Sequence, residues 1–126
     1  MTQHRQTFGR AGEDVAARFL ESKGYRILAR RYRTRVGEID LVAMTGDLVV
    51  FIEVKTRRGT AYGLPEESVH PLKQARLSKV AAQFLSGHPS LDHGGLCCRF
   101  DVVAIVWQEG RRPCLEHIED AFRPGL

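Results

Sequence analysis

The chain has 126 residues, a length typical of one domain, and 43% of them are hydrophobic, which is enough for one compact core. The formal net charge of +4 is compatible with a polyanionic partner. The three cysteines have no CxxC spacing and no apolar run approaches the roughly 20 residues of a membrane span, which argues against a disulfide framework, a zinc site and a transmembrane helix. We therefore expect a single cytoplasmic domain over residues 1–126, with no membrane contact.

The first half of the chain predicts a helix followed by three strands. Apolar residues recur at helical spacing over 8–23, and Gly24 is placed to end that helix. Residues 25–33 form a basic run that favours an extended strand. The β-branched runs 36–44 and 48–56 flank a short turn that contains glycine and aspartate, which predicts a β-hairpin.

The second half predicts a second helix and two more strands. Residues 71–85 again show apolar residues at helical intervals, whereas 86–95 has the composition of a loop. The run 100–107 is apolar on both faces, which is typical of a buried strand, and 114–118 predicts a short closing strand. The order of elements predicts an α/β fold with a mixed sheet and helices on its faces.

The hairpin places charged residues in an unusual arrangement. If residues 46–47 form a two-residue turn with glycine first, counting outward from it puts Asp40 opposite Glu53, and Glu38 opposite Lys55. The two-residue period of a strand then gathers these four side chains on one face. The other face is expected to be the core side, and it carries Ile39, Leu41, Val50, Ile52 and Val54.

Two carboxylates directly opposite on neighbouring strands repel each other, and a cation removes this objection. Mg²⁺ or Mn²⁺ suits the role, because such hard ions are held by one or two carboxylates together with water and substrate phosphate oxygens. Lys55, on the same face, could orient or deprotonate a metal-bound water or neutralise charge on a phosphate. Asp40, Glu53 and Lys55 are therefore candidate catalytic residues of a phosphodiester hydrolysis site.

The alternative interpretation is the solvated face of an ordinary amphipathic hairpin, with a cross-strand ion pair between Glu38 and Lys55. The arginines that flank the hairpin favour a nucleic-acid site, because Lys and Arg supply most contacts to phosphate. The candidate nucleic-acid contacts in these flanks are Arg31, Arg33, Arg35, Arg57 and Arg58.

Several strings of the sequence resemble the YraN-like bacterial family, predicted nucleases related to archaeal Holliday-junction resolvases. They are GRAGE at 9–13, GEIDLVA at 37–43, VFIEVKTR at 50–57, KQ at 73–74, RFDVVA at 99–104 and IEDAF at 118–122. The resemblance covers nearly the whole chain. It implies a restriction-endonuclease-like three-layer core with a PD-(D/E)xK site, in which Asp40, Glu53 and Lys55 match the motif and Ile39 replaces its proline. It also implies that the Val54 carbonyl is a metal ligand.

The resemblance adds candidates on both helices. Glu13 matches a glutamate that completes the metal site of related resolvases, although a glutamate near a helix start is also favoured by the helix macrodipole alone. Gln74 matches a glutamine that orients water or substrate, and we count it among the catalytic candidates. Lys73, Arg76 and Lys79 are candidate phosphate contacts; their alternative is a solvated helix face. Asp101 begins a buried strand, held by backbone or by arginine, and is left outside the site.

The sequence thus leads to the hypothesis of a metal-dependent endonuclease that cleaves nucleic acid, structured or branched DNA in particular, in repair or recombination. Resolvase kinship suggests a homodimer. One alternative is a nucleic-acid-binding module that keeps the fold and does not cut. Another is a protein-interaction subunit, which explains the arginines poorly.

Overall fold

The computed structural model describes residues 2–58, 69–91 and 98–124, and the predicted helices and strands appear there in the predicted order. A short 3-10 helix, η2, lies within the predicted loop, and residues 92–95 of that loop lie outside the described residues. Within the described ranges, no helix combines the length and apolar character needed to cross a membrane. The elements are α1 (Thr2–Ser22), β1 (Arg26–Arg33), β2 (Glu38–Thr45), β3 (Leu48–Arg58), α2 (Pro71–Ser86), η2 (Pro89–Leu91), β4 (Cys98–Trp107) and β5 (Cys114–Phe122).

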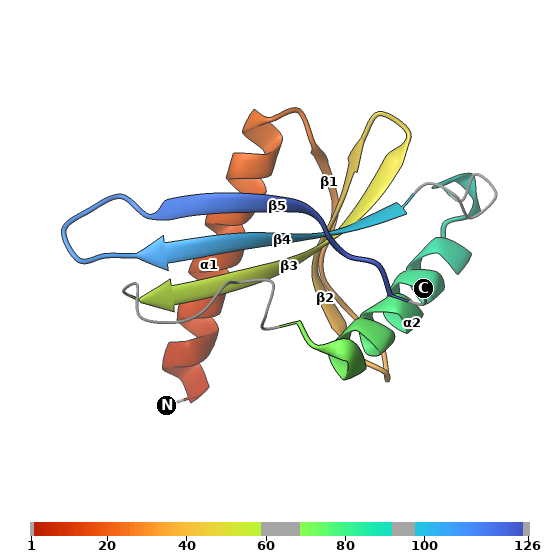
Figure 1. Ribbon diagram of the computed structural model, residues 1–126, viewed down its shortest axis with the longest axis horizontal. Coiled ribbons are helices and arrows are strands. Elements are labelled where there is room, and N and C mark those ends of the chain that lie inside the picture. Colours follow the sequence, from red (N-terminus) through yellow and green to blue (C-terminus); the bar gives the residue numbers. More distant parts are fainter. Residues whose placement is uncertain (1, 59–68, 92–97, 125–126) are drawn as a thin grey trace.

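The five strands form one sheet in the order β1-β2-β3-β4-β5. Neighbouring strands are antiparallel except β3 and β4, which run parallel. Because parallel neighbours cannot be joined by a tight hairpin, the chain passes through α2 between them (Figure 1). The mixed sheet with its two helices is an α/β fold consistent with a restriction-endonuclease-like core.

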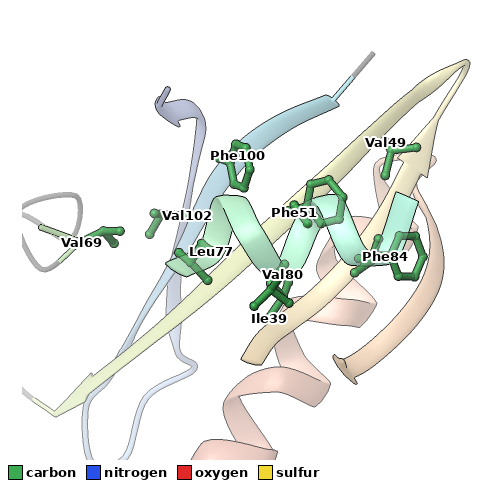
Figure 2. Close-up of a cluster of buried hydrophobic side chains, with 11 residues drawn as sticks. Ile39, Val49, Phe51, Val69, Leu77, Val80, Phe84, Phe100 and Val102 are labelled. Carbon is green, nitrogen blue, oxygen red and sulfur yellow. The ribbon is translucent and has the colours of Figure 1, made fainter. Parts of the chain in front are cut away.

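Two apolar clusters hold the helices on opposite faces of the sheet. On one face, Ala16 and Leu20 of α1 pack with Leu41, Ile52 and Val103 of the central strands. On the other face, α2 lies over the aromatic part of the core, where Phe51 stacks on Phe100 (Figure 2). The α2 side chains in this second cluster are Leu77, Val80, Ala81 and Phe84.

The hairpin register is confirmed. Thr45 pairs with Leu48, and the ladder continues outward to the pair Leu41 and Ile52. Gly46 has a φ of 58°, in the left-handed region that a glycine-first turn requires. The next step beyond the last pair brings Asp40 to Glu53.

The predicted assignment of faces is partly wrong. Leu41, Val50 and Ile52 do lie together under α1, but Ile39 belongs to the cluster under α2. The face expected to be solvated is covered by α2 as well, so Glu53 is only 6% exposed. The reason is that a helix docks on each side of the hairpin, which the alternation of polar and apolar residues could not reveal.

The predicted pairing of Glu38 with Lys55 is also not formed. Within the described residues, the ladder between β2 and β3 ends at Leu41, and Glu38 pairs with Arg33 of β1 instead. The Arg33 guanidinium lies 3.5 Å from the Glu38 carboxylate. The ion pair proposed for an ordinary amphipathic hairpin is therefore replaced by one at the β1 edge.

Candidate active site

Asp40 and Glu53 form a hydrogen-bonded carboxyl pair where the β2 and β3 ladder ends. The Val54 N–H donates to Asp40 Oδ2 at 2.8 Å. Burial, followed by the hydrogen bond with Glu53 and its negative charge, raises the pKa of Asp40 to about 9. At neutral pH the metal-free pair therefore shares one proton, which Asp40 carries and donates to Glu53.

Glu53 remains the ionised partner of the pair. Burial opposes its ionisation, but the Asp40 hydrogen bond and the nearby Lys73 together hold its pKa below the usual value. Glu53 Oε2 lies 2.6 Å from Lys73 Nζ, yet this buried oxygen has no hydrogen bond of good geometry. A buried carboxylate oxygen without a directed donor is an unusual feature that a metal ion would satisfy.

Two lysines line the carboxyl pair, one from the hairpin and one from α2. Lys55 and Lys73 are half-buried, and their amino groups lie close enough to shift each other's pKa. Burial and the neighbouring Lys73 lower the pKa of Lys55, whereas contact with Glu53 raises the pKa of Lys73 in spite of its burial. Lys73, predicted as a phosphate contact, is thus part of the carboxyl site.

Glu13 lies near the site but is held by an arginine. Its Oε1 accepts a hydrogen bond from Arg31 Nε at 2.6 Å, and Arg31 has a φ of 53°. Its negative charge makes a small contribution to the raised pKa of Asp40, after burial and Glu53. The preceding Gly12 brings α1 close to β3, because a Cβ there would overlap the Thr56 side chain. Glu13 also lines a cavity of about 320 Å³, together with Arg10, Asp14, Arg30 and Arg31.

The four predicted metal ligands, Asp40, Glu53, Glu13 and the Val54 carbonyl, stay a prediction. No group of three or more His, Cys, Asp or Glu residues suited to a metal occurs in the part of the chain that the structure describes. Glu13 pairs with Arg31, and the Val54 N–H supports Asp40. Asp40 and Glu53 alone still fit Mg²⁺ or Mn²⁺, because such an ion can take one or two carboxylates and complete its shell with water.

Gln74 is not directed at the carboxyl pair. Its Nε2 donates to the Val69 carbonyl at 2.8 Å, just before α2 begins. Its role in orienting water or substrate stays a prediction. Its neighbour Lys73 faces the site instead. The other candidate phosphate contacts stay outside the carboxyl pair; Arg33, Arg35, Arg58, Arg76 and Lys79 are exposed, and Arg57 is half-buried.

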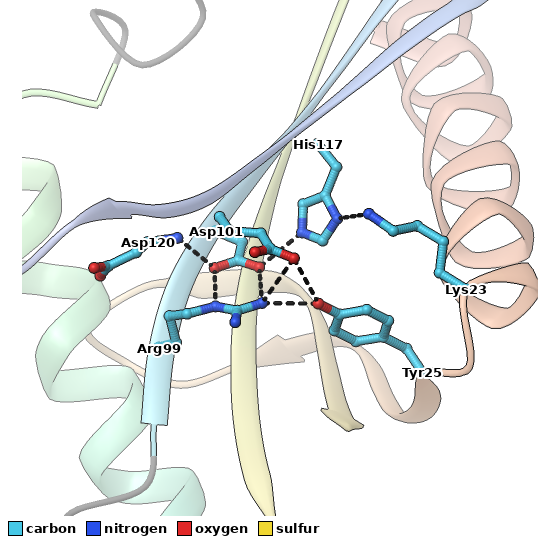
Figure 3. Close-up of polar contacts among 7 residues, drawn as sticks. Lys23, Tyr25, Arg99, Asp101, His117 and Asp120 are labelled. Atoms are coloured by element: carbon cyan, nitrogen blue, oxygen red, sulfur yellow. Dashed lines mark hydrogen bonds and ion pairs between the residues drawn. The ribbon is translucent and has the colours of Figure 1, made fainter. Parts of the chain in front are cut away.

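A second polar cluster lies beside the end of α1 (Figure 3). It centres on Asp101, which pairs with Ile52 in the β3 and β4 ladder. Asp101 is fully buried and accepts hydrogen bonds from Arg99 Nε at 2.8 Å and from the Asp120 N–H at 2.9 Å. His117 Nε2 lies 2.7 Å from Asp101, and His117 Nδ1 lies 2.7 Å from Lys23 Nζ. The expectation that backbone and arginine hold Asp101 is confirmed. The contact with His117, sixteen residues away, had no local sequence signal.

The metal-free carboxyl pair makes stability depend on pH in a defined direction. Because the folded-state pKa of Asp40 is raised, the folded chain binds more protons than the unfolded chain between about pH 4 and pH 9, so this contribution to stability falls as pH rises. Asparagine mimics protonated Asp40. We expect the free energy of unfolding of Asp40→Asn to exceed that of the wild type by about 2 kcal/mol at pH 8.5 and to equal it near pH 4. Urea unfolding in EDTA would test this, and a difference that does not change with pH would contradict it.

The family model for the uncharacterised protein family UPF0102 matches residues 12–105. The chain belongs to this family. A UPF0102 protein from Pelotomaculum thermopropionicum is 47% identical over 123 residues, covering 97% of this chain and all of the relative. Relatives from Syntrophus aciditrophicus and Geobacter sulfurreducens are 48% and 45% identical, and the alignments cover 97% and 96% of this chain and 92% of each relative. UPF0102 membership confirms the resemblance to YraN-like proteins; the family's description assigns no activity.

Proposed function

We propose that this protein is a metal-dependent endonuclease that hydrolyses phosphodiester bonds in DNA, with structured or branched DNA as its substrate in repair or recombination. The observation that carries the proposal is the Asp40 and Glu53 pair beside Lys55, in which Glu53 is buried and Asp40 is half-buried. Two carboxyl groups forced together destabilise a fold unless something neutralises them, so a pair retained inside the protein favours a functional role. A cytoplasmic homodimer, as kinship with resolvases implies, is part of the same proposal.

Asp40 and Glu53 would hold Mg²⁺ or Mn²⁺, and the Val54 carbonyl is the further ligand implied by the resemblance. A bound ion would supply an activated water and would stabilise charge on the phosphate. Asp40 is held for this task by the Val54 N–H. Lys55 would orient the attacking water or neutralise charge as the new bond to phosphorus forms and the ester bond breaks.

The arginines of α1 and β1 support a nucleic-acid substrate. Arg10, Arg30 and Arg31 line the same cavity as Glu13, whose charge acts on Asp40. Cations in such a position bind phosphates of either strand without reading the base sequence. The preference for branched or structured DNA rests on the resemblance to resolvases, and the test must therefore include several forms of DNA.

The experiment is a cleavage assay on duplex, single-stranded, flapped and four-way-junction DNA, with Mg²⁺, Mn²⁺ or EDTA. We expect cleavage that requires the metal and exceeds that of duplex on at least one branched substrate. Salt-sensitive binding of DNA without metal uptake or cleavage would overturn the nuclease and favour a non-catalytic binding module. Absence of any salt-dependent binding would favour a protein-interaction subunit.

A further inference from the structure

The Lys73 ammonium lies in the space beside Glu53 that a metal ion would need. Lys73 Nζ is 2.6 Å from the buried Oε2 of Glu53 and lies close to Lys55. The two partners differ in exposure, because the Glu53 side chain is 6% exposed and that of Lys73 is 35% exposed. Lys73 therefore reaches the carboxylate from the open side of the site.

The position of Lys73 in its helix is unfavourable for a cation. Residue 73 lies in the first turn of α2, whose N-cap is His70, and this turn contains no acidic residue. The N-terminus of a helix carries a partial positive charge and favours anions. Helix formation thus does not account for a lysine here, whereas neutralisation of Glu53 does.

The contact is also easily exchanged. Glu53 Oε2 has no hydrogen bond of good geometry, so the attraction to Lys73 is chiefly one of charge, which another cation can replace. The flexible stem of lysine lets its ammonium move outward into solvent without disturbing the helix backbone. Two cations on one carboxylate oxygen repel each other, so a metal ion at Glu53 would displace Lys73.

We propose that Lys73 is a positioning residue that neutralises Glu53 while no metal is bound, and that an arriving divalent ion displaces its ammonium toward a phosphate of the nucleic acid. This inference rests on the proposed function, since it presupposes a metal at Asp40 and Glu53. Metal binding and phosphate binding then favour each other. The metal ion takes the place of Lys73 at Glu53, and the phosphate gives the released ammonium a new partner.

The test is calorimetric titration of the metal-free protein with Mn²⁺ at fixed pH and without nucleic acid. We expect Lys73→Met to bind Mn²⁺ about tenfold more tightly than the wild type, because no ammonium has to be displaced. Lys79→Met removes the same charge from an exposed position of α2, and Lys73→Arg keeps the charge. Both are expected to bind Mn²⁺ within about twofold of the wild type.

The outcomes separate this inference from the proposed function. Unchanged or weaker Mn²⁺ binding by Lys73→Met, with normal binding by the wild type, would overturn the role of Lys73 and leave the metal site standing. Absence of Mn²⁺ binding in every variant would overturn the proposed function as well. If Lys73 had a purely structural role, its replacement would lower thermal stability without tightening metal binding. Lys73→Gln replaces Lys73→Met if the methionine variant does not fold.

Discussion

Glu53→Gln is expected to reduce DNA cleavage by roughly 1000-fold or more, the effect of losing several kcal/mol of metal-dependent stabilisation. The amide keeps the size of the buried side chain but cannot supply a negative charge to the ion. DNA binding should change little, because it depends on arginines outside the pair. Single-turnover cleavage and binding measured on the same labelled DNA would show the two effects separately.

Lys55→Met is expected to lower cleavage by about 100-fold and to leave Mn²⁺ binding in place, since Lys55 acts on water and phosphate. Glu116→Gln on β5 is the control for loss of a charged group, because Glu116 is exposed and lies outside both polar clusters. Cleavage retained within tenfold by both Glu53→Gln and Lys55→Met would contradict the proposed site.

Asp101→Asn is expected to destabilise the protein by about 3 kcal/mol while leaving the rate of cleavage by folded protein unchanged. The fully buried carboxylate neutralises Arg99 and binds His117. Its removal leaves the mostly buried guanidinium with only the more distant and exposed Glu119 carboxylate, at 3.8 Å. Burial opposes ionisation of Asp101, but His117, Arg99 and the Asp120 N–H hold its pKa below the usual value. Urea unfolding at neutral pH measures the loss.

The pH dependence of stability provides a check on the Asp101→Asn prediction. A carboxyl group with a lowered folded-state pKa stabilises the protein above its unfolded-state pKa, and this contribution is lost as pH falls through the folded-state pKa. The difference between wild type and Asp101→Asn should therefore shrink below about pH 4. Asp120→Asn changes an exposed carboxylate paired with Arg123 and should cost far less stability than Asp101→Asn. Equal losses for the two variants would contradict a special role for Asp101.

The sequence allowed the register of the hairpin next to its turn to be predicted, because that register depends on local chemistry. Gly46 can adopt the left-handed conformation of a two-residue turn, and that turn alone fixes which residues pair. Counting residues outward from this turn predicted that Asp40 lies opposite Glu53. The order and type of the helices and strands were also predictable, since the spacing of apolar residues along each of them is regular.

The sequence could not predict contacts that depend on how the helices dock. Lys73 and Gln74 are neighbours in α2, and the rotation of the helix decides that Lys73 meets Glu53 while Gln74 turns to a backbone carbonyl. The contact made by Glu13 could not be predicted either. Its hydrogen bond with Arg31 depends on the left-handed backbone conformation of Arg31, which no local sequence pattern predicts.

These tertiary contacts sharpen the choice between a nuclease and a non-catalytic binding module. In the metal-free protein the Asp40 and Glu53 charges are balanced by one shared proton and by Lys73. Such internal neutralisation lets the protein fold without an ion, so folding alone cannot reveal the metal. Direct observation of the ion is therefore the decisive evidence.

The most direct test is a crystal structure of the protein grown with Mn²⁺, whose anomalous scattering locates the ion without reference to the model. We expect an ion bound by carboxylate oxygens of both Asp40 and Glu53, at about 2.0–2.2 Å, with water in the remaining positions. The same crystal should show the Lys73 ammonium moved away from Glu53. A Mn²⁺ ion bound elsewhere, with Asp40 still hydrogen-bonded to Glu53, would contradict the account.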